Sequence, residues 1–250
     1  MRSTMNGGGN IIRDGLVLYV DAANTKSYPG TNNDWFDLTK NSINGVATNG
    51  PTFDSTNYGS FIFDGNDDFI QFGQPDNLKF TNSQPHTISA WVYWTPTAGT
   101  LTTIVSFGNV AGAFPGVGDE GYYLSLDSGV LGVDAFLFDY YDGSNPADVI
   151  SIIGNNNTAP TNTWFNITAT NNGSNTAAGL KVYINGSLSQ WTTRIDQPTL
   201  SIDYSNSNFN IGARDATSTI NGKISSTLVY NRVLTASEIE QNFLAIKSRY

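Results

Sequence analysis

The sequence predicts an all-β protein, an antiparallel sandwich or barrel that ends in one short α-helix. Short strand-like runs follow one another along the 250 residues, with turns rich in Gly, Asn and Asp between them, as in antiparallel all-β domains. A complete helix-start signal stands near the end of the chain. No fixed-period repeat and no Pro- or Ser-rich linker divides the sequence. We therefore expect one domain over residues 13–250, preceded by a flexible polar arm over residues 1–12.

The expected strands are rich in β-branched and aromatic residues, which suit a pleated, half-buried surface. They cover residues 16–20, 61–63, 69–72, 87–94, 102–107, 121–126, 133–141, 164–170, 180–184, 187–191, 209–212 and 224–230. Alternation within the run 87–94 places four residues on one face of a sheet: Ile88, Ala90, Val92 and Trp94. The segments 64–68 and 185–186 read as tight turns between strands, because Asn, Asp and Gly accept the backbone angles that such turns require.

The closing helix is predicted from its start signal. Thr235 precedes Glu238 by three residues, which is the spacing of a capping box, and Leu234 and Ile239 have the spacing of a hydrophobic staple. Apolar residues then recur at helical spacing: Ile239, Phe243 and Ile246. We interpret these residues as structural.

Composition excludes several classes of function. The formal net charge of −9 and the scattered basic residues do not suit nucleic acid, because a phosphate-binding face needs clustered Lys and Arg. No apolar run approaches the roughly 18 residues of a membrane-spanning helix. The first ten residues have no apolar core of a secretory signal.

Five segments in order carry a resemblance to a known family. They are GLVLYVDAAN at 15–24, FIFDGNDDFI at 61–70, TISAWV at 87–92, KVYING at 181–186, and residues 211–243. The chain resembles the laminin G-like, concanavalin A-like jelly-roll superfamily, in the three-block variety of tailed-phage virion and bacterial surface proteins. This resemblance implies two packed, curved antiparallel sheets and a binding or structural role. The phrases SYPG at 27–30 and NGPT at 49–52 look most like virion-associated proteins of tailed phages.

Catalysis is not expected. Glycosidases need paired carboxylates around the scissile bond, and this chain has three Glu: Glu120, Glu238 and Glu240. The one His, His86, stands in a loop-like segment with no nucleophile elbow in the sequence, so we interpret it as a solvated residue. Zinc is disfavoured by one His and no Cys. A glycoside hydrolase remains the weakest alternative.

Calcium is the metal that the sequence suits, because Ca²⁺ takes several carboxylate and carbonyl oxygens from turns. The candidate ligands are Asp67 and Asp68, Asp119 and Glu120, and Asp215. For Asp67 and Asp68 the alternative role is turn formation. The resemblance implies a site between loops equivalent to those of Asp119 and Asp215. Of the several acids that calcium-binding relatives carry in the second loop, this chain keeps Asp215.

Sugar binding requires exposed aromatic rings beside amides and carboxylates. The candidates are Phe114, Tyr122, Tyr140, Tyr141, Asp142 and Asn145. The alternative for the aromatic residues is a place in the core. Tyr140 and Tyr141 are adjacent, so on a strand they point to opposite faces.

The combined expectation is a non-catalytic surface module of a phage virion, a decoration or fibre-type protein assembled in the host cytoplasm. It would contact other virion proteins through the N-terminal arm or a sheet face, and adhere to host or environmental polysaccharide. Monomer and homo-oligomer both remain open. The alternative is a calcium-assisted carbohydrate-binding module of an extracellular bacterial surface protein. Neither nucleic acid nor membrane insertion is expected.

Overall fold

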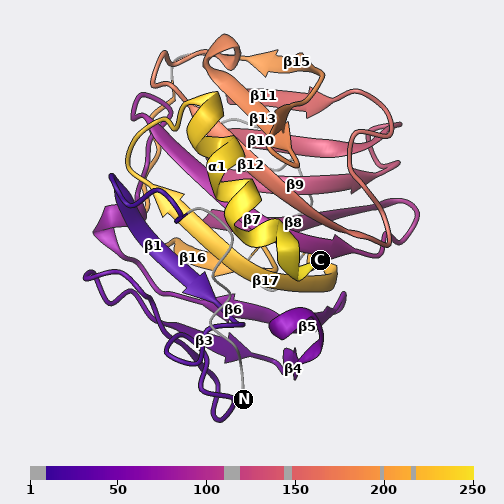
Figure 1. The fold of residues 1–250 in the computed structure, drawn as a ribbon. Coiled ribbons are helices and arrows are strands. Elements are labelled where there is room, and N and C mark those ends of the chain that lie inside the picture. The colour runs from indigo at the N-terminus through magenta and orange to yellow at the C-terminus, as the bar shows by residue number, and fades with distance from the viewer. Residues whose placement is uncertain (1–9, 110–118, 144–147, 198–199, 215–217) are drawn as a thin grey trace.

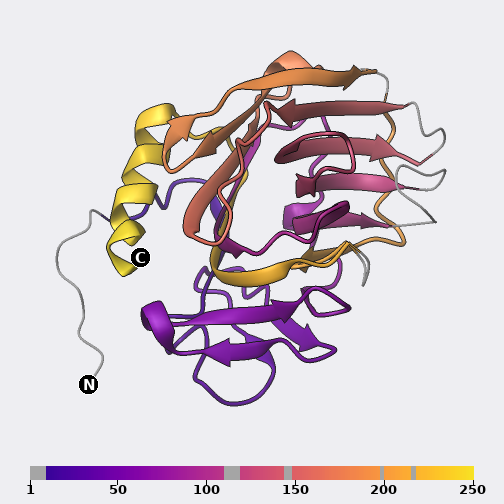
Figure 2. The ribbon, with the colours of Figure 1, turned by 90° about the vertical axis from the view of Figure 1, so that its right-hand side faces the viewer.

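The computed structural model describes residues 10–109, 119–143, 148–197, 200–214 and 218–250. Two antiparallel sheets lie face to face, and helix α1 (Ala236–Ile246) covers the outer side of one of them (Figures 1 and 2). The predicted two-sheet sandwich with a C-terminal helix is therefore confirmed. Among these residues, no helix is long and apolar enough to cross a membrane.

The sheet beneath the helix, sheet A, has β7 and β17 at its centre. Its order is β14 (Ser187–Leu188), β13 (Leu180–Ile184), β12 (Trp164–Asn171), β7 (His86–Trp94), β17 (Asn221–Tyr230), β5 (Ser60–Asp64) and β4 (Thr52–Asp54). A further strand, β1 (Leu16–Asp21), pairs with β17 from Leu16–Tyr230 to Asp21–Ser226. Strands from both ends of the chain thus meet in one sheet.

The second sheet, sheet B, combines long central strands with short edge strands. Its order is β15 (Trp191–Asp196), β11 (Val149–Gly154), β10 (Asp134–Asp142), β9 (Glu120–Ser128), β8 (Thr100–Asn109), β16 (Asn208–Ile211), β6 (Phe69–Gln71), β3 (Gly45–Thr48) and β2 (Asp34–Trp35). Five strands lie where the sequence analysis expected none or only a strand end: β2, β3, β4, β11 and β15. Short 3₁₀ turns link some strands: η1 (Thr56–Tyr58), η2 (Asp76–Leu78), η3 (Ala177–Gly179) and η4 (Lys247–Arg249).

The main core fills the space between the two sheets. The inward residues of β7 are those expected from alternation, and all four are buried in it: Ile88, Ala90, Val92 and Trp94. Each large apolar side chain removed from water contributes roughly 1.5–3 kcal/mol. A 250-residue chain can therefore hold this fold by its core, without disulfides.

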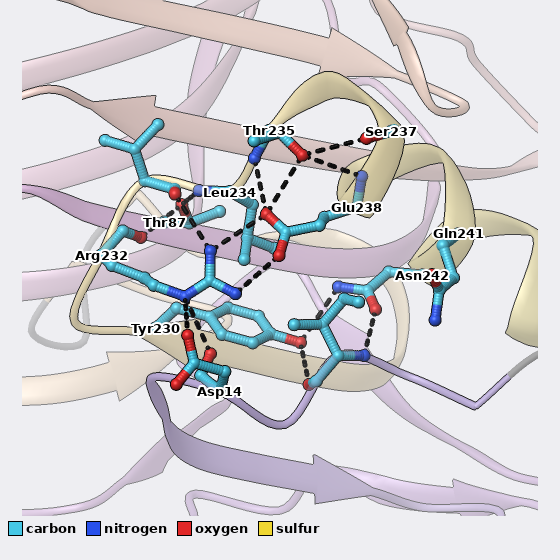
Figure 3. Close-up of polar contacts among 12 residues, drawn as sticks. Asp14, Thr87, Tyr230, Arg232, Leu234, Thr235, Ser237, Glu238, Gln241 and Asn242 are labelled. Atoms are coloured by element: carbon cyan, nitrogen blue, oxygen red, sulfur yellow. Dashed lines mark hydrogen bonds and ion pairs between the residues drawn. The ribbon is translucent and has the colours of Figure 1, made fainter.

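Helix α1 begins as the sequence predicts. The Thr235 hydroxyl accepts from the Glu238 amide at 3.3 Å, and the Thr235 amide donates to the Glu238 carboxylate at 2.8 Å (Figure 3). Leu234 and Ile239 are buried together in a second apolar cluster, where the helix packs on Trp91 of sheet A. This contact fixes the helix on the outer face of the sheet.

Both described ends of the chain are held against sheet A. Tyr250 stacks on Trp91 and Trp164, with ring centroids 4.5 and 4.4 Å apart. Arg249 makes two contacts of 2.8 and 2.9 Å with the buried Asp21 carboxylate.

Part of the expected N-terminal arm is packed against the domain. The Ile12 amide donates to the Asn242 side chain at 2.8 Å, and the Ile12 carbonyl accepts from the Tyr230 hydroxyl at 2.9 Å. The Asn10 carbonyl accepts from Gln241 at 2.7 Å. Residues 10–12 therefore belong structurally with the domain, and residues 1–9 lie outside the described part of the chain.

Candidate ligand-binding site

An open polar groove of about 490 Å³ lies where strands of both sheets begin or end. We call it the end groove. Its lining residues come from three segments far apart in the sequence: Asp64, Gly65, Asn66, Thr97, Thr100, Leu101, Thr102, Ser218, Thr219 and Asn221. The volume is within the roughly 300–1,000 Å³ of small-molecule sites.

The turn after β5 forms one wall of the end groove. Asp64 accepts from the Asn66 amide and from its side chain, both at 2.8 Å, which closes the turn. Gly65 has φ +79°, and a Cβ there would lie 2.8 Å from the Cβ of Asn221. Glycine is therefore required both for the turn and for its approach to β17.

The opposite walls are held by backbone hydrogen bonds. The Thr95 amide donates to the Asn221 carbonyl at 2.9 Å, and the Thr103 amide donates to the Ser218 carbonyl at 2.7 Å. The Thr100 hydroxyl donates to the Thr97 carbonyl at 2.6 Å. The groove is thus built on strand ends rather than on long loops.

The lining presents one carboxylate, two carboxamides and several hydroxyls, with no cation among its described residues. Hydrogen bonds from Asn66 lower the pKa of Asp64 below its ordinary value, so this group is ionised and acts as an acceptor at neutral pH. The Asn221 carboxamide has no hydrogen bond to any other described side chain or backbone group. Such a set of donors and acceptors matches the hydroxyl groups of an uncharged ligand.

The two predicted calcium ligands Asp67 and Asp68 lie beside the end groove. Together with Asp64 they bring carboxylate oxygens within 4.8 Å of one another. Asp68 is buried and accepts from the Asp64 amide at 3.0 Å, and burial raises its pKa. The turn role and a cation role are therefore both compatible with these side chains, since Ca²⁺ takes further oxygens from water or ligand.

The second pair of predicted calcium ligands is Asp119 and Glu120, and each interacts with a different partner. Asp119 forms a buried ion pair with Arg214, whose guanidinium also lies 4.7 Å from the centre of the Tyr123 ring. Glu120 accepts from the Asp203 amide at 2.6 Å. Asp119 before β9 and Arg214 after β16 are thus in contact, and among the described residues Arg214 supplies the positive charge at this position. Asp215 lies outside the described residues.

The three predicted sugar-binding tyrosines are buried. Tyr122 and Tyr140 lie in the main core with no exposed surface, and their hydroxyls bond Leu78 and His86 at 2.8 and 2.7 Å. Tyr141 points to the opposite face of β10 from Tyr140, as expected for adjacent strand residues, and is buried in a small cluster with Tyr123. In this arrangement none of the three rings can stack on a sugar at the surface, so the interpretation of these aromatics as core residues is the correct one.

Of the other predicted sugar ligands, Asp142 is half-buried at the end of β10, opposite Glu120. Phe114 and Asn145 lie outside the described residues. The end groove was not predicted, because its Thr, Ser and Asn residues carry no distinctive local pattern.

His86 is not the solvated loop residue that the sequence suggested. It is the first residue of β7, has no exposed surface, and stacks on Phe80 with ring centroids 4.4 Å apart. Its Nδ1 lies 2.8 Å from the Gln84 carbonyl, so Nδ1 carries the proton and Nε2 accepts from Tyr140. Burial lowers its pKa to about 4, so His86 is a neutral structural residue at physiological pH.

The concanavalin A-like lectin/glucanases superfamily is the family whose model matches the chain, over residues 64–240. With the two antiparallel sheets, this match confirms the jelly-roll fold that the sequence analysis expected. A search of curated proteins found no match.

Solved structures share this fold at low sequence identity. The binding domain of Paraclostridial Mosquitocidal Protein 1 is 20% identical with a TM-score of 0.62, over 92% of this chain and 52% of that one. The ligand-binding domain of botulinum neurotoxin serotype D, in complex with N-acetylneuraminic acid, is 16% identical with a TM-score of 0.63, over 92% and 50%. Trypanosoma rangeli sialidase in complex with sialic acid is 15% identical with a TM-score of 0.60, over 94% and 33%. The chain spans about half the length of these binding domains, and the likeness shows the fold alone.

Proposed function

Because the chain belongs to the concanavalin A-like lectin/glucanases superfamily, we propose that it is a non-catalytic glycan-recognition module whose ligand lies in the end groove. The observation that carries this proposal is the groove itself, an open polar space of about 490 Å³ where strands of both sheets begin or end. Its acceptors and donors suit a neutral, hydroxyl-rich ligand. Two structural neighbours are complexes with N-acetylneuraminic acid or sialic acid; these sugars are acidic, so they support saccharide binding in general, and the neutral class rests on the lining of the groove.

The non-catalytic assignment is supported by the chemistry of the groove. Asp64 is the one carboxylate among its described lining residues, and its lowered pKa is opposite to what a general acid needs. His86, the only histidine, is buried with both ring nitrogens engaged. A glycosidase would require a second carboxylate positioned across the scissile bond. Asp67 and Asp68 do not line the groove, and Asp68 is buried and accepts from the Asp64 amide.

Calcium is proposed as an accessory to this site. Asp64, Asp67 and Asp68 supply three converging oxygens, and a bound Ca²⁺ would offer open positions to ligand hydroxyls or water. We expect Ca²⁺ to raise the melting temperature of the wild type. The variant Asp67→Asn, at an exposed carboxylate of this group, should remove the shift. A melting temperature that neither EDTA nor added Ca²⁺ changes would contradict the accessory role.

The biological setting that we propose is a phage virion, with the module as a decoration or fibre-type protein. The support is the resemblance of its opening residues to tailed-phage virion proteins. Mass spectrometry of purified virions is expected to detect the chain, and deletion of residues 1–10 is expected to abolish its incorporation. Detection on bacterial surfaces alone, and never in virions, would favour the alternative of a bacterial surface module.

The binding function itself is tested with a glycan array followed by titration of the strongest uncharged ligand. Two variants remove groove donors: Thr219→Val, which keeps the shape of the side chain, and Asn221→Ala, which removes the carboxamide. Asn206→Ala, an exposed residue outside the groove, is the matched control. We expect the groove variants to weaken binding about tenfold, the cost of a lost hydrogen bond to a bound ligand, and the control to bind like the wild type. Equal binding by all four proteins would refute the end groove as the site.

A further inference from the structure

A second groove, of about 370 Å³, lies at the other end of β17. We call it the basic groove. Its lining residues are Arg13, Asp14, Gly15, Leu16, Val17, Lys40, Asn41, Asn77 and Asn231. Asn221 begins β17 in the end groove and Asn231 follows its last residue, and ten strand residues at about 3.3 Å each separate the two grooves by roughly 30 Å.

Two cations in the basic groove are not neutralised by described residues. Arg232 beside the groove is neutralised, because its guanidinium bonds Glu238 at 2.7 and 3.0 Å and Asp14 at 2.8 Å (Figure 3). Asp14 and Glu238 are both bonded to Arg232, and these three side chains together carry one net negative charge, which the two remaining cations of the groove exceed. Arg13 and Lys40 are exposed, and neither forms an ion pair with another residue in the described part of the chain.

The backbone that carries both cations is ordered by hydrogen bonds. The Leu16 amide donates to the Arg13 carbonyl at 3.1 Å, and the Asn231 amide donates to the Gly15 carbonyl at 2.9 Å. On the other side, the Asn41 side chain donates to the Val17 carbonyl at 2.7 Å, which ties the Lys40 segment to β1. The two positive charges are therefore presented from fixed positions.

The rest of the lining indicates what kind of anion fits. Asn77 and Asn231 are exposed, and neither side chain forms a hydrogen bond with another described residue. Carboxamides pair well with hydroxyl groups, and guanidinium and ammonium groups with carboxylates. We propose that the basic groove binds a carboxylate-bearing sugar, such as a uronic acid residue of an acidic polysaccharide.

Attraction of such a ligand to this groove is short-range. The chain carries a net charge of −9, so most of its surface repels a polyanion. Binding at Arg13 and Lys40 is then local, and it weakens as salt screens the attraction. This second site is independent of the end groove, because no residue lines both.

The test is a titration of the full chain with tri-galacturonic acid and with its uncharged methyl ester, at low ionic strength. The double variant Arg13→Gln/Lys40→Gln removes the groove charges. Lys26→Gln/Lys181→Gln, at two exposed lysines outside the groove, changes the net charge equally and serves as the control. We expect the groove variant to weaken binding of the acid at least about tenfold, and the control to bind like the wild type.

Three results would overturn the proposal. They are no binding of the acid to the wild type, an equal loss in the control variant, and equal displacement by inorganic sulfate, which would indicate a site for a bare anion. The neutral ligand of the end groove is titrated in the same proteins. If the Arg13→Gln/Lys40→Gln variant still binds this neutral ligand, a loss of acid binding is specific to the basic groove, and the two sites can fail independently.

Discussion

Replacing His86 by Phe tests the buried, neutral state that the structure gives this residue. Burial lowers the pKa of His86 from 6.5 to about 4. A group with a depressed pKa contributes stability that is lost as pH falls, because the unfolded chain takes up the proton first. The loss begins near pH 6.5 and is nearly complete near pH 4. At about 1.4 kcal/mol per unit of pKa, the wild type should lose roughly 3 kcal/mol across this window through His86 alone.

The assay is urea unfolding followed by tryptophan fluorescence, at pH 7.5 and pH 4.5, for the wild type and His86→Phe. The variant leaves the Tyr140 hydroxyl without its partner, so it should be less stable than the wild type at pH 7.5 by about 1–3 kcal/mol. That deficit should shrink by about 2–3 kcal/mol at pH 4.5. A deficit that is the same at both pH values would show that His86 titrates normally and would refute the reasoning.

Three further predictions follow from buried and capping contacts. Burial raises the pKa of Asp139 to about 6, so it contributes stability below pH 4 that is lost as pH rises through 6. On going from pH 7 to pH 5, Asp139→Asn should therefore change in stability less favourably than the wild type, by about 1 kcal/mol in the same assay, and an identical change in both proteins would contradict this. Thr235→Ala should cost about 1 kcal/mol of unfolding free energy, and Ser237→Ala should cost less; equal losses would argue against the capping box. Asp119→Asn should cost about 3 kcal/mol because it removes one charge of the buried ion pair with Arg214, and a melting temperature like that of the wild type would exclude a structural role for the pair.

The elements that could be predicted from the sequence are those with local causes. The Thr235–Glu238 capping box and the alternation of β7 depend on residues a few positions apart, and both are as expected. Strand β11 was missed although Val149–Gly154 is an apolar run. The two-residue strand β2 has no local signal, since pairing with β3 alone defines it.

The candidate sites depend on pairing between distant segments. Asp64 meets Asn221 in the register of β5 and β17, and no local pattern specifies that register. His86 looked like a loop residue, and only its stacking on Phe80 and its bond to Tyr140 reveal a core position. Of the tyrosines proposed for sugar binding, Tyr122 and Tyr140 point into the main core, and Tyr141 points to the outer face of sheet B. That face is also buried at this position, where Tyr141 packs with Tyr123 and Arg214 lies over the Tyr123 ring.

The most direct test of the account is to locate a bound neutral glycan by NMR. The side-chain amides of Asn66 and Asn221 are reporters inside the end groove, and that of Asn206 is a reporter outside it. Titration with the strongest uncharged ligand of the array should shift the first two resonances in proportion to occupancy and leave the third unchanged. Saturable binding that leaves Asn66 and Asn221 unshifted would contradict the central claim that this groove is the glycan site.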